Sequence, residues 1–112
     1  MQDEEELLQK IENERFKNVY RDKNGNKIDS EKLEELLRDP DYKIVAGECI
    51  DNFYISTVWL GIGFGLGIHY FETASFKDGK FIDVINRYST LMQAKKGHQE
   101  IVKLMKENLS NG

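Results

Sequence analysis

The fold of this chain is decided by the stretch Ser56-Thr57-Val58-Trp59-Leu60-Gly61-Ile62-Gly63-Phe64-Gly65-Leu66-Gly67-Ile68. In an extended backbone, successive side chains point to opposite faces. One face of the glycine-rich part would therefore carry large apolar side chains, and the other only hydrogen. A bare face lets a ligand, a partner or another backbone approach closely, but four glycines also weaken a strand. We expect a continued strand or a flexible flap beside Trp59.

The glycines do not fit a phosphate-binding motif. A P-loop needs Lys and then Ser or Thr after its last glycine, and Gly67 is followed by Ile68 and His69. The dinucleotide fingerprint also fails, because its third glycine would fall on Leu66 or Ile68. We expect a structural role for the segment, with a platform for a ligand or a partner as the alternative.

The composition is typical of a globular protein. The 112 residues are 39% hydrophobic and 32% charged. A chain of this length can bury a core of its own, so we expect a single domain over residues 1–112. The net charge is −4, and residues 1–51 hold 15 of the 20 acidic residues. Nucleic-acid-binding domains usually show a basic stripe, so we do not expect a nucleic-acid partner.

The sequence predicts neither a membrane segment nor a secretory leader. The first residues are acidic, and the longest apolar run, 58–68, is too short to cross a bilayer. Cys49 is the single cysteine and stands in an apolar run, so we expect a small buried thiol and not a nucleophile. We expect a cytoplasmic protein without a membrane partner.

The spacing of apolar residues predicts an α+β fold. An antiparallel sheet of about four strands should pack against a long C-terminal helix, with two helices earlier in the chain. Asn24-Gly25 and Asp78-Gly79 are typical of tight turns, and Thr90 with Gln93 forms a capping-box pattern. Helices are predicted over residues 3–17, 30–38 and 90–108, and strands over 42–50, 53–60, 69–76 and 81–88.

We expect no metal and no cofactor. Residues 22–29 resemble part of a calcium loop, but the positions that need Gly and Glu hold Lys27 and Leu33. His69 and His98 have no partner at a metal-ligand spacing. No Ser or Cys stands in a nucleophile elbow, so nucleophilic catalysis is unsupported.

Five residues are candidates for binding. Glu72 stands in an apolar strand, where a buried carboxylate needs a partner, and Arg87 on the next strand could supply it. This pair has either a structural role or a role in ligand recognition or acid–base chemistry. His98 lies on the apolar stripe of the last helix, as a satisfied core histidine or as a functional residue. Trp59 and Tyr70 could stack on a ring-shaped ligand.

The order of several short motifs resembles a family of small, mostly uncharacterised phage and prophage accessory proteins, over about residues 19–105. One departure is that Gly63-Phe64 stands where the family pattern commonly has an Asp-His pair, which favours binding over catalysis. The matching pieces are Tyr20, Asp22 and Gly25, then Asp39-Pro40-Asp41-Tyr42, Ser56-Thr57-Val58-Trp59-Leu60-Gly61, Phe71-Glu72-Thr73, Arg87-Tyr88-Ser89-Thr90, Ala94, and Gly97-His98.

The resemblance implies a phage origin and action in the cytoplasm of a bacterial host. We expect a non-enzymatic accessory protein that counters a bacterial defence system by binding a defence protein or a small nucleotide-like signal. Trp59 and Tyr70 would stack on the target, Arg87 and His98 would hold an anionic group, and Glu72 would orient them. A homo-oligomer is a further expectation. The alternatives are a small hydrolase or transferase with Glu72 and His98 as acid–base pair, and a virion or assembly component.

Overall fold

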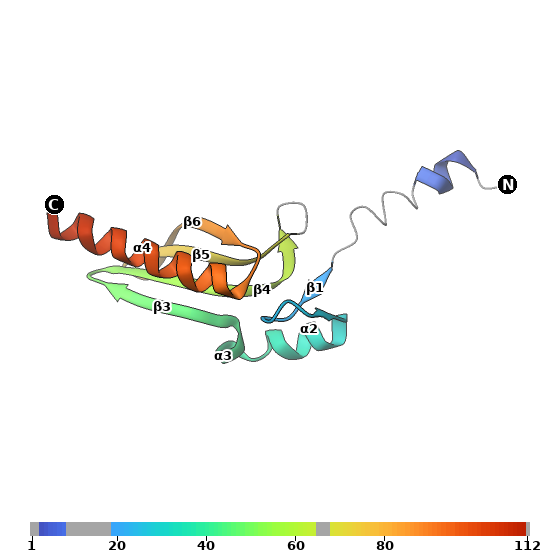
Figure 1. Cartoon of the computed structure of the whole chain (residues 1–112), viewed down its shortest axis with the longest axis horizontal. Coiled ribbons are helices and arrows are strands. Elements are labelled where there is room, and N and C mark those ends of the chain that lie inside the picture. Colours follow the sequence, from blue (N-terminus) through green and yellow to red (C-terminus); the bar gives the residue numbers. More distant parts are fainter. Residues whose placement is uncertain (1–2, 9–18, 65–67, 112) are drawn as a thin grey trace.

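The computed structural model describes residues 3–8, 19–64 and 68–111 of the chain. It confirms the α+β architecture: one antiparallel sheet with a long C-terminal helix along one of its faces (Figure 1). The strands are β1 (Tyr20–Arg21), β2 (Lys27–Ile28), β3 (Ile44–Ile50), β4 (Phe53–Phe64), β5 (His69–Lys77) and β6 (Lys80–Tyr88). The helices are α2 (Ser30–Leu37), α3 (Pro40–Lys43) and α4 (Leu91–Asn111), and residues 4–8 are also helical.

The sheet has two more strands than the four expected. Its order is β2-β1-β4-β5-β6, and β3 pairs with β4 as well. The additional strands form the small β1–β2 hairpin, which closes at Gly25 with a φ of +86°. Asp22 accepts hydrogen bonds from the backbone N–H groups of Asn24 and Asn26, both at 2.9 Å. The segment that partly resembles a calcium loop is therefore a self-capped turn, as expected.

The glycine-rich stretch continues β4 beyond the predicted end at Leu60. The strand runs to Phe64, and its pairing with β5 shifts register between Trp59 and Phe64. Gly61 has a φ of +78°, a backbone conformation that side chains disfavour, and it allows the strand to bend there. Beyond the bend, Ile62 pairs with Tyr20 of β1. Residues 65–67 lie outside the described part of the chain, as do residues 9–17 of the predicted helix 3–17.

The predicted strand over residues 42–50 begins two residues late. Asp39 caps a short helix by accepting hydrogen bonds from the N–H groups of Asp41 and Tyr42. Pro40 suits the first turn of a helix, where its missing N–H costs nothing. Pro40 therefore starts α3 as well as ending α2, and β3 begins at Ile44.

The prediction of a buried Cys49 is wrong, because the thiol is exposed. Side chains alternate along β3, and Ile50 is the residue that packs inward against Ile55 and Val102. Cys49 pairs with Tyr54 on the opposite face of the sheet. The apolar run around Cys49 did not reveal that none of the described helices covers this face.

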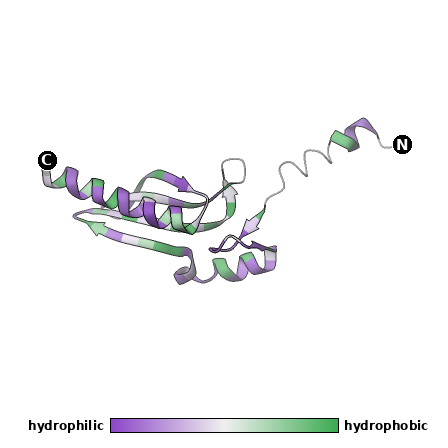
Figure 2. Ribbon diagram, in the orientation of Figure 1, coloured by the Kyte–Doolittle hydropathy of each residue, from purple (hydrophilic) through white to green (hydrophobic). Residues whose placement is uncertain are grey.

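Helix α4 covers one face of the sheet and closes the core, which is formed mostly by residues of the strands. The predicted capping box is present: Thr90 Oγ1 accepts the N–H of Gln93, and Gln93 Oε1 accepts the N–H of Thr90. Figure 2 shows hydrophobic and hydrophilic residues alternating along α4, as an amphipathic helix requires. Its buried residues are Ala94, His98 and Val102.

The other face of the sheet carries a row of aromatic rings. Phe76 lies 6.3 Å from Tyr54 and 5.9 Å from Phe81, measured between ring centroids. Tyr54 and Phe81 are both exposed. The described part of the chain contains no helix long and apolar enough to cross a membrane.

Strand β6 forms one edge of the sheet and is irregular. Two register shifts leave Ile82 and Ile85 without a partner residue on β5. Asp83 accepts a hydrogen bond from the N–H of Val84 at 2.8 Å, and Asn86 accepts one from the N–H of Arg87 at 2.9 Å. Ile82 and Ile85 are therefore β-bulges. Polar side chains of this edge strand also accept hydrogen bonds from its own backbone.

Gly97 is predicted to be intolerant of alanine. A Cβ at this position would overlap the ring of Tyr88, which packs directly on the glycine. Alanine usually favours a helix over glycine by about 1 kcal/mol, but overpacking costs about 1–3 kcal/mol. We expect Gly97→Ala to lower the free energy of unfolding in urea. Lys96→Ala, an exposed neighbour, should change it by less than about 0.5 kcal/mol, and a stabilised Gly97→Ala would contradict the packing.

Candidate binding pocket

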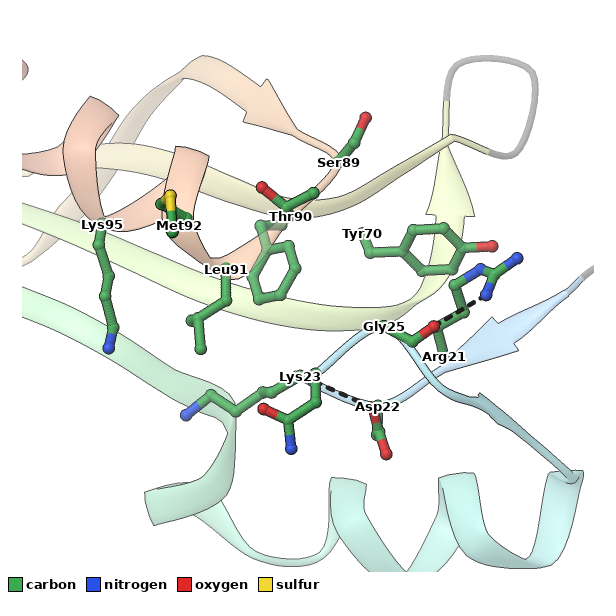
Figure 3. A pocket seen from close by; sticks show the side chains of 12 residues that line it. Arg21, Asp22, Lys23, Gly25, Tyr70, Ser89, Thr90, Leu91, Met92 and Lys95 are labelled. Atoms are coloured by element: carbon green, nitrogen blue, oxygen red, sulfur yellow. Dashed lines mark hydrogen bonds between the residues drawn. The ribbon is translucent and has the colours of Figure 1, made fainter.

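A cavity of about 410 Å³ lies where the β1–β2 hairpin approaches the start of β5 and the first turn of α4. Figure 3 shows the residues that line it. The hairpin contributes residues 21–25, β5 contributes Tyr70 and Phe71, and the third wall is formed by residues 89–92 and Lys95. Segments from both ends of the sequence thus form one pocket, of a size typical for small-molecule sites.

Three aromatic side chains hold the hairpin in place. The indole N–H of Trp59 donates to the carbonyl oxygen of Arg21 at 2.8 Å. The hydroxyl of Tyr70 donates to the carbonyl oxygen of Val19 at 2.9 Å, and the hydroxyl of Tyr42 accepts the N–H of Lys23 at 2.9 Å. These bonds tie β1 and the residues on both sides of it to β4, β5 and α3, and they fix one wall of the pocket.

The walls carry three cationic side chains. Arg21 donates to the carbonyl oxygen of Gly25 at 2.8 Å, and its guanidinium carbon lies 5.9 Å from the centre of the Tyr70 ring. Lys23 Nζ donates to the carbonyl oxygen of Ile44 at 3.0 Å. Burial lowers the pKa of Lys23, and the nearby charge of Lys95 lowers it further.

One acidic side chain is among the described residues that line the pocket. Asp22 is already engaged in the hairpin turn, where one of its oxygens accepts two backbone N–H groups and the other accepts the side-chain amide of Asn26. In Figure 3 it lies on the hairpin, away from Lys95. The pocket therefore has more positive than negative charge, although the whole chain is acidic.

The floor of the pocket is apolar. Tyr70 and Phe71 are almost fully buried in the protein and line the floor, together with Leu91. Met92 is 81% exposed, which is unusual for so large an apolar side chain. Flexible methionines adapt to the shape of a bound ring. The pocket thus combines an apolar floor and rim with cationic walls.

The structure places Trp59 and Tyr70 in different surroundings. Tyr70 lines the pocket, and its ring forms part of the floor. Trp59 is 0% exposed, and its ring makes a T-shaped contact with the ring of Tyr42 at 5.1 Å between centroids. In this arrangement the indole has no free face for a ligand, and it supports the pocket from behind.

His98 lies in the core under α4. It is 5% exposed, and its Nδ1 is 2.7 Å from Thr57 Oγ1. Thr57 in turn bonds Thr73 at 2.5 Å between the two Oγ1 atoms, and Thr73 donates to the hydroxyl of Tyr88 at 3.1 Å. These four buried side chains form one hydrogen-bonded chain between α4 and strands β4, β5 and β6. Within the described ranges, no buried side-chain polar atom lacks a partner.

Glu72 and Arg87 lie on the opposite face of the sheet from His98. They face each other across β5 and β6, as predicted, with 3.5 Å between Arg87 Nε and Glu72 Oε2. Their side chains are 22% and 43% exposed, so this is a surface ion pair. The five predicted binding residues are thus not gathered in one site, and of the five Tyr70 lines the pocket.

The sequence reasoning did not select Arg21, Lys23 or Lys95 for binding. Arg21 and Lys23 flank an Asn-Gly turn, a signal for local structure alone. Lys95 belongs to a run of basic residues typical of a solvated helix face. No local pattern connects positions about 70 residues apart, so the sequence offered no signal that they share a pocket.

Comparisons with other proteins give no further assignment. No family model, no curated protein and no solved structure matches the chain. Among the residues that the structure describes, no three His, Cys, Asp or Glu side chains are grouped to hold a metal ion. The candidate site is therefore defined by its geometry and charge.

The burial of His98 predicts a pH dependence of stability. Burial lowers the pKa of His98 in the folded chain, and the charge of Glu48 opposes this more weakly. The unfolded chain then binds the proton more readily than the folded chain. The stabilising effect is complete above about pH 6.5, the usual histidine pKa, and is lost as the pH falls below it.

Urea unfolding between about pH 7.5 and pH 5 measures this effect. We expect the midpoint to fall with pH in the wild type and the fall to be smaller in His98→Gln. His69→Gln, which removes the other histidine of the chain, should keep the wild-type slope. An unchanged slope in His98→Gln would show that another group carries the dependence.

Proposed function

We propose that this protein is a non-enzymatic phage accessory protein that counters a bacterial defence system by binding and sequestering a small nucleotide-like signal. The observation that carries the proposal is the pocket between the β1–β2 hairpin and α4. It is lined by Arg21, Lys23 and Lys95 and has a floor formed by Tyr70 and Phe71. A nucleotide-like molecule combines an aromatic ring with an anionic phosphate, which matches this lining.

The electrostatics of the pocket support an anionic ligand. Cations in a partly enclosed site attract an anion more strongly than cations on an open surface, because solvent screens them less. The hydrogen bonds of Arg21 and Lys23 hold both side chains at the pocket walls before a ligand arrives. Such preorganisation reduces the entropy lost on binding.

The first turn of α4 adds polar groups to the same wall. The N–H of Ala94 is bonded to the carbonyl oxygen of Thr90, and that of Gln93 to the Thr90 side chain. The N–H groups of Leu91 and Met92 precede any helical carbonyl that they could bond. The exposed hydroxyl groups of Ser89 and Thr90 border the pocket beside them. These donors suit phosphate or ribose oxygens and supplement the three cations.

The geometry favours binding over the alternative of acid–base catalysis by Glu72 and His98. A general acid and base act on one substrate and must both reach it. Glu72 pairs with Arg87 on the open face of the sheet, whereas His98 bonds Thr57 under α4. The sheet itself separates the two side chains.

A thermal-shift screen of the purified chain tests the proposed function. The ligands are nucleoside monophosphates and diphosphates, cyclic mononucleotides and dinucleotides, and cyclic ADP-ribose isomers. A ligand at about 100 times its dissociation constant stabilises a protein by about 2.7 kcal/mol. For a domain of this size we expect the unfolding midpoint to rise by roughly 10 °C.

A charge-reversed variant locates the binding. Lys95→Glu should weaken the affinity about 10-fold to 100-fold, because a charged contact is lost and a repulsive one is added. Lys103→Glu lies on the same helix outside the pocket and should bind as the wild type does. A screen without any shift would refute the proposal, and capture of a host defence protein or co-purification with virus particles would then favour the other expected roles.

A further inference from the structure

The two ends of the pocket differ in chemistry. Figure 3 shows the amine groups of Lys23 and Lys95 at one end, and Arg21 beside the Tyr70 ring at the other. Leu91 lies between the two ends, and Phe71 also lines the pocket. A ligand that fits this arrangement has a compact anionic group at the lysine end and a ring on the apolar floor.

The lysine end of the pocket places the stricter requirement on the charge of a ligand. Lys23 is held at the wall by the carbonyl oxygen of Ile44 and lies 5.1 Å from the centre of the Tyr42 ring. Lys95 makes no hydrogen bond or ion pair with any residue that the structure describes. Two ammonium groups thus share this end of the pocket, and no described carboxylate bridges them.

Like charges repel, so the ammonium groups of Lys23 and Lys95 disfavour each other at this end of the pocket. The pKa of Lys23 is lowered by burial and then by Lys95, while Asp39 raises it to a smaller extent. A ligand that carries two negative charges on one compact group would relieve this repulsion for both lysines. A ligand with a single charge would balance one of them.

Phosphate groups divide into these two classes. A terminal phosphate monoester carries a charge of about −1.5 to −2 at neutral pH, because its second pKa is about 6. A terminal diphosphate carries more than two charges, because its last ionisation has a similar pKa, whereas the phosphodiester of a cyclic mononucleotide carries one. The lysine end therefore distinguishes molecules that have the same base and sugar.

We propose that the pocket is selective for a nucleotide whose phosphate group is at least doubly charged, a terminal monoester or a terminal diphosphate, over one whose phosphate is a singly charged cyclic diester. This inference rests on the proposed function, because it names the ligand class of the same pocket. The cavity lies near the small end of the usual range for ligand sites, which suits one nucleotide unit. Tyr70 and Phe71 hold the ring, and Lys23 and Lys95 hold the phosphate.

Calorimetric titration of the full chain with matched ligands tests the inference. For each base, the ligands are the nucleoside, its 5′-monophosphate, its 5′-diphosphate and its 3′,5′-cyclic monophosphate, with inorganic phosphate as a further arm. We expect the monophosphate or the diphosphate of at least one base to bind about 10-fold tighter than the cyclic form, a difference of about 1.4 kcal/mol. Inorganic phosphate should bind more weakly than the preferred nucleotide, because it has no ring.

Neutral variants test the origin of the preference. Lys95→Gln should reduce the preference for the doubly charged form to less than about threefold, with a smaller loss for the cyclic form. Lys96→Gln removes the neighbouring charge outside the pocket and should preserve the preference. Lys95 is exposed and makes no bond with the described residues, so its replacement should leave the fold intact, which circular dichroism can verify.

The outcomes separate this inference from the proposed function. Cyclic forms that bind as tightly as the doubly charged forms, or a preference that survives Lys95→Gln, would overturn the inference and leave a nucleotide pocket in place. Inorganic phosphate that binds as well as every nucleotide would overturn the assignment of a ring to the floor. A failure of all nucleotides to bind would overturn the proposed function and the inference together.

Discussion

The structure depends on the complete burial of Trp59 between the sheet and the N-terminal hairpin. Its indole has one polar atom, which must be bonded when the ring is buried, and the carbonyl oxygen of Arg21 accepts that bond. Gly61 makes room for the ring, since a Cβ there would meet Leu33 and Trp59 itself. One tryptophan thus joins the strand that bends at Gly61 to the hairpin that forms a wall of the pocket.

The pocket is a consequence of this connection. Without the bond from Trp59 to Arg21 and the pairing of Tyr20 with Ile62, little would hold the hairpin near the start of α4. The other wall is held by the buried chain of hydrogen bonds from His98 to Tyr88, which fixes α4 on the sheet. The cationic side chains thus project from a hairpin and a helix that are both held by packing and buried hydrogen bonds. A preorganised binding site needs such rigid elements.

Local features of the fold were accessible from the sequence, and the pocket was not. Asp78-Gly79 specifies a hairpin, and Thr90 with Gln93 specifies a helix start, because each acts on its own neighbours. Tertiary contacts decide the rest. Trp59 and His98 have chemistry suited to a ligand, but both side chains are buried. The indole N–H of Trp59 is already bonded to Arg21, and Nδ1 of His98 to Thr57. The short helix at Pro40 was missed because one capping residue does not change the spacing of apolar residues. The exposure of Cys49 was missed because that spacing does not tell which face of the sheet a helix covers.

The irregular edge strand β6 has a consequence for the behaviour of the protein in a crowded cell. Strands at the edge of a sheet can recruit further chains into ordered aggregates, because their free N–H and C=O groups form a template. In β6 the donors of Val84 and Arg87 are already engaged by neighbouring side chains, and the bulges at Ile82 and Ile85 interrupt the register. An incoming strand would find no uninterrupted ladder to extend. The two bulges thus oppose edge-to-edge growth of the sheet at β6.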